Sequence, residues 1–495
     1  MKKNLSFLFA LFLWFSLLGI ANAQSGSFKP TYCPEGYSDT KATWECGYVI
    51  VPEDHEKPQG KTIKLFVAKA KSRSSRPASD PVIFPGGPIG GGMIEAGSML
   101  FSLYPDFTKD RDFIMFDQRG SGKSIPALEC PELDEIHKRD FGKNLSNAEV
   151  VDHELKAIEE CRKRLTKDYD LDLYNIIQTT SDMEVIRKAL GYNKINIFSY
   201  SYGTSVTLTY MRMYPKNIRS VILDSTVPSD MWIYSNLLPG QANSLSSVFE
   251  SCRLDKKCNA AYPDLKNVYS DLIKRLDSAP AKVTVANPHC PIGLRCNPVN
   301  IPVHGGLFSN YILNELFSAN PIPRVPKFIY DSYTRNYASL AKMIDGQAGG
   351  EGIKTSWGRY YATVCYDNVF SENRETIEKS IARYPWVGLP HYQPVTLEGE
   401  IKSVCEKWVG DTAPPAQGLP VISDIPTLIL QGQYDPYSPP SWGRHVYATL
   451  SNSYFYVFPG LTHVPILGEA CPISIATQFV SDPDKEPNSS CIKSN

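Results

Sequence analysis

Short apolar runs, rich in β-branched and aromatic residues, restrict the possible folds of this chain more than any other feature. Runs of this kind predict buried strands. They lie at residues 46–51, 62–70, 81–84, 112–117, 195–200, 220–224, 426–431 and 453–458. The first two are close enough for an antiparallel hairpin, whereas helix-compatible stretches such as 148–166 and 181–190 separate later runs. This alternation predicts a mainly parallel sheet covered by helices.

A long region in the middle of the chain interrupts this pattern. It is rich in Tyr, Pro and Lys and has few strand-like runs. Helix-compatible segments lie near residues 241–252, 264–276, 305–317 and 328–345. We therefore predict a mainly helical insertion at 229–415, between two portions of one core at 24–228 and 416–495.

The first 23 residues, 1–23, are expected to be a cleaved signal peptide. Lys2 and Lys3 precede an apolar run from Leu5 to Ile20, and small residues of a cleavage site follow at 21–23. That run is short for a membrane span, and no second long apolar run follows it. We expect an exported protein, periplasmic or secreted, without a membrane anchor. The net charge of −1 gives no electrostatic reason to expect nucleic-acid binding.

The 12 cysteines fit an oxidising compartment. Sequence alone does not fix their connectivity, but they fall into neighbouring couples, and we predict consecutive pairing. The couples are Cys33 with Cys46, Cys130 with Cys161, Cys252 with Cys258, Cys290 with Cys296, Cys365 with Cys405, and Cys471 with Cys491. A zinc site is disfavoured because the short couples lack C-x-x-C spacing and only His289 lies beside a cysteine. No metal and no cofactor is predicted.

The stretch FSYSYGT, residues 198–204, joins a predicted strand to a helix-compatible segment. It nearly fits the G-x-S-x-G turn that presents a nucleophilic serine. In such a turn the serine adopts a strained, usually positive φ, and the residues two before and two after it must be small. For Ser201 these are Ser199 and Gly203, whereas Ser199 would have the bulky Ile197 on one side. We predict Ser201 as the nucleophile.

A serine nucleophile needs a general base and an acid that orients the base. In this kind of sheet the chain order is serine, acid, histidine. Asp435 follows the 426–431 run and His463 follows the 453–458 run, where parallel sheets place ligand-binding loops. Asp224 is the alternative acid, but its position just before the insertion favours a structural role.

The developing negative charge on the substrate oxygen also requires backbone N–H donors. One is expected from Tyr202, directly after the nucleophile. The second is expected from the glycine-rich loop at 84–92, at Gly87 or Gly86, which the sequence does not distinguish. The string RGSGKS at 119–124 ends like a phosphate-binding loop, but Asp117 stands where that pattern requires glycine.

These segments together resemble the exported tripeptidyl aminopeptidase branch of the proline-iminopeptidase-like α/β-hydrolases. GGPIGGG at 86–92 resembles the family's GGPG loop, DQRGSGKS at 117–124 its DQRGxGxS, and SYSYGT its GxSYGT. GQYDPYSP and GLTH resemble its acid and histidine segments. Two residues depart from the pattern: Ile89 replaces the last glycine of GGPG, and Ser199 replaces the glycine before the nucleophile.

The resemblance implies the α/β-hydrolase fold, with an N-terminal antiparallel hairpin and a helical cap. It also implies a serine exopeptidase that removes short peptides from a free N-terminus, with Ser201, Asp435 and His463 as its triad. Residues 117–119 would brace the loops of the site, with Arg119 binding a substrate carboxylate as the alternative. The cap would supply an acid for the substrate ammonium, but the sequence does not identify it.

Two other functions fit the same residues. One is an exported esterase or acyl hydrolase with the same triad, and the other is a non-catalytic binding module. The second is disfavoured because all three triad residues are present. The sequence does not give the residue preference, the number of residues released or the oligomeric state.

Overall fold

The computed structural model describes most of the chain. The described residues are 26–35, 37, 42–94, 101, 109–143, 145, 147–231, 233–287, 290, 296–317, 322, 324–348, 354–369, 374–387, 400–467 and 469–492. The expected signal peptide, residues 1–23, lies outside them, as does His289. Within the described ranges, no helix has the length and apolar character needed to cross a membrane.

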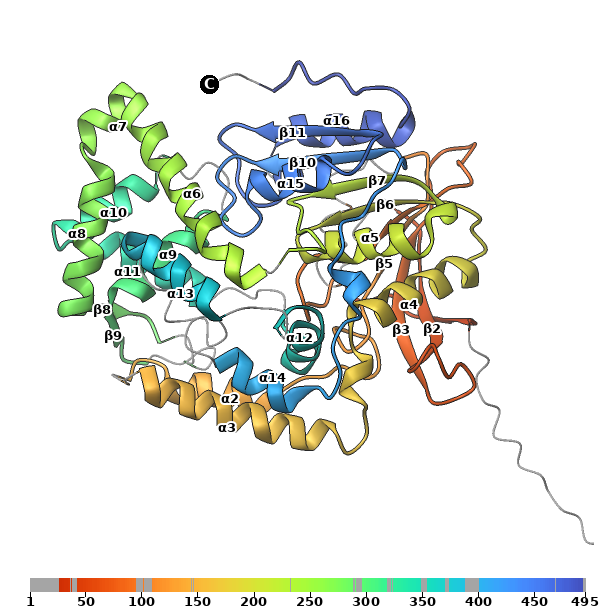
Figure 1. The fold of residues 1–495 in the computed structure, drawn as a ribbon, viewed down its shortest axis with the longest axis horizontal. Helices are drawn as coiled ribbons and strands as arrows, with labels where there is room; N and C mark the ends of the chain where they lie inside the picture. Colours follow the sequence, from red (N-terminus) through yellow and green to blue (C-terminus); the bar gives the residue numbers. More distant parts are fainter. Residues whose placement is uncertain are drawn as a thin grey trace, which may run out of the picture.

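A nine-stranded sheet forms the centre of the described structure (Figure 1). Its strand order is β1-β2-β3-β5-β4-β6-β7-β10-β11. The first three pairings, β1–β2, β2–β3 and β3–β5, are antiparallel, and all the following ones are parallel. The strands are β1 Phe28–Thr31, β2 Trp44–Pro52, β3 Thr62–Ala70, β4 Val82–Phe84, β5 Phe113–Phe116, β6 Ile195–Tyr200, β7 Ile218–Asp224, β10 Thr427–Gly432 and β11 Ser453–Phe458. The predicted mainly parallel sheet with an N-terminal antiparallel hairpin is confirmed, while the short, exposed β1 was not predicted.

Helices cover both faces of this sheet. One face packs against α4 Ile176–Ala189, α5 Tyr202–Met213 and α15 Pro440–Tyr447, and the other against α16 Ala470–Ser481. The central strands are buried on both sides: in β10, Ile429 faces the first set while Leu428 and Leu430 face the second. Alternate side chains of a strand point to opposite faces, so a continuous apolar run suits a sheet with two covered faces.

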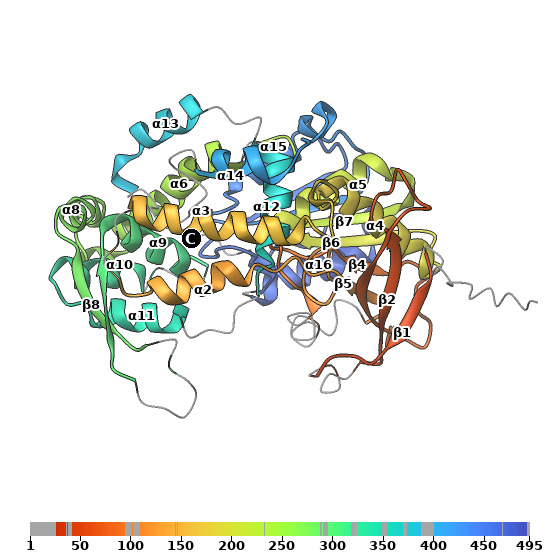
Figure 2. The ribbon, with the colours of Figure 1, turned by 90° about the horizontal axis from the view of Figure 1, so that it is seen from below.

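A second group of helices forms a cap beside the sheet, and α6, α8, α9, α10 and α11 of this group share a hydrophobic core of their own (Figures 1 and 2). The helices are α6 Ile233–Leu254, α7 Lys256–Ala261, α8 Leu265–Ser278, α9 Gly305–Glu315, α10 Val325–Tyr333, α11 Ala338–Ala348, α12 Trp357–Val364, α13 Arg374–Arg383 and α14 Glu400–Trp408. All of them lie within the range predicted for the insertion, whose boundaries stay a prediction. An antiparallel pair, β8 Ala281–Val285 and β9 Val299–Val303, was not predicted there.

Two helices of the N-terminal portion join the cap helices instead of covering the sheet. They are α2 Pro131–Asp140 and α3 Asn147–Leu165. Ile158 and Leu165 of α3 share a buried cluster with Tyr361 of α12 and Trp408 of α14. The view from below shows α3 alongside α2, α12 and α14 (Figure 2). The expectation that the segment 148–166 covers the sheet is therefore wrong. The helix forms where it was predicted, but its apolar face did not reveal which partner would cover it.

Six disulfides join the twelve cysteines, each to its neighbour in the chain. Two of them restrain the layer formed by α2, α3, α12 and α14: one links the start of α2 to α3, and the other links the end of α12 to α14. These two are Cys130 to Cys161 and Cys365 to Cys405. The other four bonds are Cys33 to Cys46, Cys252 to Cys258, Cys290 to Cys296, and Cys471 to Cys491.

Three of those four disulfides link a segment near the end of one helix or strand to a neighbouring part of the chain. The bond from Cys33 to Cys46 ties the segment after β1 to β2, and the bond from Cys252 to Cys258 links α6 to α7. The bond from Cys471 to Cys491 holds the C-terminal segment against the start of α16.

A buried ion pair braces the loop that follows β5. The Arg119 side chain is fully buried and donates from Nε and Nη2 to the Asp182 carboxylate, at 2.7 Å for each bond. Its other N–H groups donate to the carbonyls of Pro52, Glu53 and Leu173. These contacts use all five guanidinium donors. Arg119 therefore braces the loop, and no donor remains for a substrate carboxylate.

Replacing Arg119 with methionine should lower the free energy of unfolding by about 3–5 kcal/mol, because Asp182 would stay buried without its guanidinium partner and would keep only the hydrogen bond to His55. Urea denaturation with the disulfides intact measures this. Arg253→Met is the matched control, because Arg253 forms an exposed pair with Glu250 and its loss should cost under ~1 kcal/mol. Equal unfolding midpoints for the two variants would contradict this role of Arg119.

Candidate active site

Ser201 lies in a sharp turn between β6 and α5. Its backbone has φ 54° and ψ −137°, an unfavourable conformation for a residue other than glycine. Gly203 packs directly on the glycine-rich loop: its N–H donates to the Gly87 carbonyl at 3.0 Å, and an added Cβ would overlap the Gly86 carbonyl oxygen. The predicted need for a small residue at 203 thus has a steric cause.

Ser199 replaces the usual glycine of this turn without leaving a polar group unsatisfied. Its side chain is fully buried, and its hydroxyl is hydrogen-bonded to that of Thr207 on α5 at 2.8 Å. The strand and the helix therefore approach closely with a serine in place of glycine.

Asp435 and His463 are hydrogen-bonded through the loops that follow β10 and β11. His463 Nδ1 donates to Asp435 Oδ2 at 2.9 Å, and Ser438 Oγ donates to the same oxygen at 2.8 Å. Oδ1 accepts from the N–H groups of Tyr437 and Ser438, both at 2.9 Å. With Nδ1 protonated towards Asp435, Nε2 of His463 is left as the proton acceptor.

The environment of Asp435 keeps its carboxylate ionised. Burial acts to raise its pKa, but the His463 charge and the hydrogen bonds from His463, Ser438 and Tyr437 together lower the pKa below its usual value. A charged acid at this position can orient the imidazole and stabilise its protonated form.

Asp224, the alternative acid, has a different environment. It is fully buried at the end of β7, and its Oδ2 accepts from the Ile466 N–H at 3.0 Å instead of contacting the imidazole. Burial, with a contribution from the nearby charge of Asp435, raises the pKa of Asp224 well above its usual value. Its neighbour Ser225 accepts from the Val464 N–H at 2.7 Å. Asp224 and Ser225 therefore hold the loop that carries His463.

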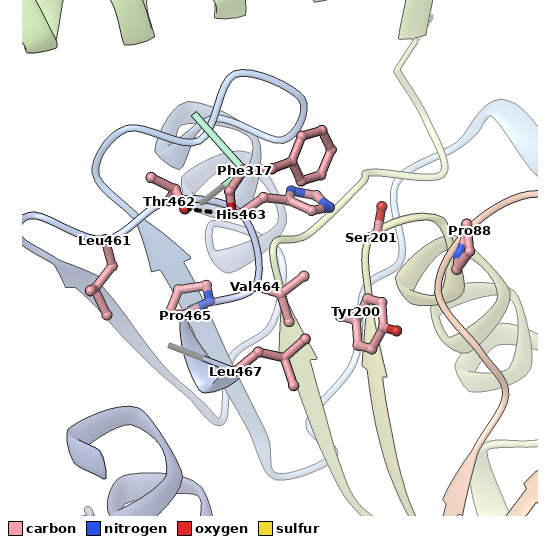
Figure 3. Close-up of a pocket in the computed structure, with 10 residues that line it drawn as sticks. All are labelled: Pro88, Tyr200, Ser201, Phe317, Leu461, Thr462, His463, Val464, Pro465 and Leu467. Carbon is pink, nitrogen blue, oxygen red and sulfur yellow. Dashed lines mark hydrogen bonds between the residues drawn. The ribbon is translucent and has the colours of Figure 1, made fainter. Parts of the chain in front are cut away.

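Ser201 and His463 line the same pocket (Figure 3). One imidazole nitrogen lies on the side facing the Ser201 hydroxyl. In the described part of the chain, no hydrogen bond joins the two side chains. Bonds of this type often tighten only when substrate is bound.

The expected oxyanion donors surround Ser201. Tyr202 is the first residue of α5, and Gly86 and Gly87 lie against the same turn. Gly86 has φ 103°, which favours glycine at that position. Pro88 follows them and has no N–H to offer, so Gly86 and Gly87 both stay candidates for the second donor.

The cap holds the acid and histidine loops directly. Ser244 of α6 donates to the Asp435 carbonyl at 2.5 Å, and Tyr437 donates from its hydroxyl to Asn314 of α9 at 2.8 Å. Thr462, next to His463, donates to the carbonyl of Phe317 just after α9, at 3.3 Å. The positions of the acid and the base therefore depend on the cap as well as on the sheet.

Asp367 is a residue of the site that sequence reasoning did not identify. It lies in the π-helical turn Cys365–Val369, and its Oδ2 accepts from the Tyr202 hydroxyl at 3.0 Å. Oδ1 is buried without a hydrogen-bond partner. Burial raises the pKa of Asp367 to about 7, against the lowering effects of Arg359 and of hydrogen bonds from Tyr202 and Ile176. No local motif marks this aspartate, because its partner Tyr202 lies far away in the sequence.

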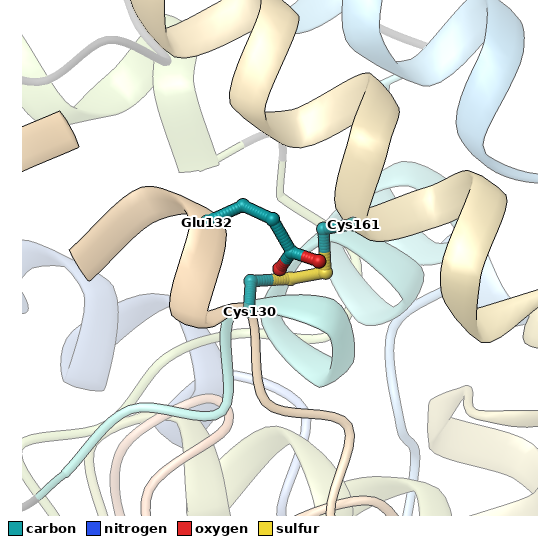
Figure 4. Close-up of side chains that lie close together, drawn as sticks. All are labelled: Cys130, Glu132 and Cys161. Carbon is teal, nitrogen blue, oxygen red and sulfur yellow. A yellow bond between two sulfur atoms is a disulfide. The ribbon is translucent and has the colours of Figure 1, made fainter. Parts of the chain in front are cut away.

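One cluster contains residue types that can bind a metal ion, but their ligand atoms already form a disulfide and an ion pair. Within the described ranges, Cys130, Glu132 and Cys161 bring suitable ligand atoms together (Figure 4). The two sulfurs form a disulfide, and the Glu132 carboxylate accepts two hydrogen bonds from Arg164 at 2.7 and 3.0 Å. A disulfide offers no thiolate to a metal ion, and the cluster is a covalent link reinforced by an ion pair.

Comparisons with known proteins identify relatives of this chain. The family described as alpha/beta hydrolase fold matches residues 80–288, and the family described as TAP-like protein matches residues 392–491. Serine protease Hip1 of Mycobacterium tuberculosis is 30% identical over 458 residues, covering 88% of this chain and 84% of that protein. A tripeptidyl aminopeptidase of Streptomyces lividans is 30% identical over 224 residues, which are 41% of this chain and 40% of the relative's length.

Solved structures also overlap with the chain. A proline iminopeptidase from Mycobacterium smegmatis is 12% identical, with 88% of this chain and 98% of that one covered and a TM-score of 0.38. An overlap at this level carries no functional argument, and the sequence relatives determine the family.

Exchanging each acid for its amide should separate their roles. Asp435→Asn should lower kcat by about 10³–10⁴-fold, because the amide no longer fixes the histidine tautomer or stabilises its charge. Asp224→Asn should lower kcat less than about tenfold, because an amide oxygen can still accept from Ile466. Steady-state kinetics on one substrate, with circular dichroism to check folding, measures both. A larger loss in Asp224→Asn than in Asp435→Asn would reverse the assignment.

Proposed function

The chain belongs to the α/β-hydrolase family, and we propose that it is an exported serine exopeptidase that releases short peptides from a free N-terminus. One observation carries the proposal: His463, which is hydrogen-bonded to Asp435, lines the same pocket as Ser201. The similarity to Hip1 and to a tripeptidyl aminopeptidase supports peptide bonds as the target. The six disulfides support export, because such bonds persist in oxidising compartments.

The reaction proceeds through an acyl-enzyme. Ser201 Oγ attacks the scissile carbonyl carbon while His463 Nε2 takes the hydroxyl proton. The oxygen that gains negative charge accepts hydrogen bonds from the N–H of Tyr202 and from that of Gly86 or Gly87. When the C–N bond breaks, His463 gives its proton to the leaving amine. His463 then deprotonates a water molecule, which attacks the acyl carbon. As the bond from that carbon to Ser201 Oγ breaks, His463 returns the proton to Oγ and the peptide is released.

Asp367 is the candidate anchor for the substrate's α-ammonium group. It belongs to the cap region, it contacts Tyr202 beside the nucleophile, and its buried Oδ1 lacks a partner. A partly buried ion pair contributes more than an exposed one, provided that hydrogen bonds satisfy both groups. An anchor at a fixed place would favour chain ends over internal peptide bonds.

An esterase or other acyl hydrolase is the second candidate. The observation that favours it is the pocket beside Ser201, whose lining residues include no Asp or Glu. An ester substrate needs no ammonium anchor, so N-terminal blocking distinguishes the two functions.

N-acetylation of a fluorogenic peptide amide should lower kcat/KM by at least about tenfold, because the blocked end can no longer pair with an acid. Hydrolysis of the free-amine peptide and of a short-chain ester is measured side by side, with Ser201→Ala as the inactive control. Equal rates for free and acetylated peptides, beside faster ester hydrolysis, would favour the acyl hydrolase instead.

Activity on free-amine peptides should depend on the ionisation of Asp367. Its pKa near 7 leaves it increasingly neutral at lower pH, so the ability to pair with ammonium is present above about pH 7 and is lost below it. The ratio of kcat/KM for a peptide to that for a neutral ester should fall about tenfold per pH unit below 7. Using this ratio removes the contribution of the shared His463.

Asp367→Asn keeps an acceptor for Tyr202 but removes the charge. It should lower peptide kcat/KM by roughly 10–100-fold and make the ratio independent of pH between 5.5 and 7.5. Glu315→Gln is the matched control, since Glu315 is a cap acid already paired with Arg324 at 2.6 Å. A pH-independent ratio in the unmodified protein would exclude Asp367 as the anchor.

A further inference from the structure

The pocket beside Ser201 is an apolar cavity of about 390 Å³. Its walls come from the loop after β4, the end of β6, the segment after α9 and the histidine loop (Figure 3). The lining residues are Pro88, Tyr200, Ser201, Phe317, Leu461, Thr462, His463, Val464, Pro465 and Leu467. This volume lies in the lower part of the range for small-ligand pockets, which suits one large side chain beside the scissile bond.

No lining residue carries a permanent charge. The Thr462 hydroxyl donates to the Phe317 carbonyl, and His463 Nδ1 is bound to Asp435. A charged substrate side chain entering this cavity would lose its hydration without finding an opposite charge. An apolar side chain would instead gain from leaving water.

Phe317 is an exposed aromatic residue that lines this cavity. It is 44% exposed, although its ring lies edge-on to the His463 imidazole, with centroids 4.8 Å apart, and 4.5 Å from the Tyr437 ring. The hydrogen bond from Thr462 to its carbonyl fixes its backbone. An exposed, fixed aromatic surface next to the reacting groups is a surface that a bound apolar group would cover.

Two residues of the cavity wall are adjacent in sequence to the proposed oxyanion donor Gly87 and to Ser201. Pro88 directly follows Gly87, and Tyr200 directly precedes Ser201. The residue whose carbonyl is attacked must place its oxygen at those donors, and its side chain then lies nearest to this wall. We propose that the cavity binds the side chain of that residue, on the acyl side of the cleaved bond, and selects large apolar side chains over charged ones. This inference rests on the proposed exopeptidase function.

The test is a panel of free-amine peptide amides, Ala-Ala-X-aminomethylcoumarin, with X as Leu, Phe, Lys or Glu. The kcat/KM values for Leu and Phe should exceed those for Lys and Glu by at least about tenfold. Leu467→Asp places a carboxylate in the wall and should lower the Leu-to-Lys ratio at least about tenfold. Phe317→Ala should lower the same ratio by weakening binding of the apolar substrates.

Ile422→Asp is the matched control. Ile422 is 83% exposed and lies before β10, at the edge of the sheet opposite to the catalytic loops, so the ratio should not change. A preference of the unmodified protein for Lys or Glu would overturn the inference. An unchanged ratio in Leu467→Asp, or a preference for apolar residues only after the cleaved bond, would also overturn it.

Failure of the proposed function would look different. In that case no free-amine peptide is cleaved, although a fluorophosphonate probe labels Ser201. A p-nitrophenyl butyrate ester then replaces the peptides and is compared with the negatively charged p-nitrophenyl succinate. Faster hydrolysis of the butyrate than of the succinate by the unmodified protein supports the apolar cavity. Equal rates for the two esters overturn it.

Discussion

The buried carboxylate of Asp435 is the group on which the site depends most. It is removed from water, and its negative charge is compensated by hydrogen bonds from His463, Ser438 and Tyr437. Cap helices contact the same loop, where Ser244 donates to the Asp435 carbonyl and Asn314 accepts from the Tyr437 hydroxyl. Since a buried charge without partners is strongly unfavourable, these donors from the acid and histidine loops keep the acid ionised beside the imidazole.

The nucleophile turn shows the same dependence on packing. Ser201 keeps a strained φ because the Gly203 backbone fits against Gly86 and the Ser199 hydroxyl finds Thr207. The two acids near it illustrate how environment separates chemical roles. Asp435, supplied with hydrogen-bond donors by His463, Ser438 and Tyr437, has a lowered pKa, whereas the pKa of Asp224 is raised by burial. One acid can therefore orient the histidine while the other supports the loop that carries it.

The strands of the sheet could be predicted closely, because burial on both faces produces continuous apolar runs that a short window of sequence reveals. The turn at Ser201 was equally local, since its constraint concerns residues only two positions away. The partner of α3 could not be predicted, because an amphipathic helix reports that one face is covered but not by what. The short β1 and the β8–β9 pair carry too little apolar sequence to be recognised.

The sequence by itself therefore determined the mainly parallel sheet, its antiparallel start, the strand ends that carry Ser201, Asp435 and His463, and the family. Tertiary structure alone decided which of the two acids contacts the imidazole, that Arg119 is fully used by Asp182 and nearby carbonyls, and that Asp367 lies beside Tyr202. It also placed the ring of Phe317, from the cap region, edge-on to the His463 imidazole. The physical reason is that hydrophobic periodicity and turn sterics act between near neighbours in the chain, whereas hydrogen bonding, burial and pKa depend on residues that only folding brings together.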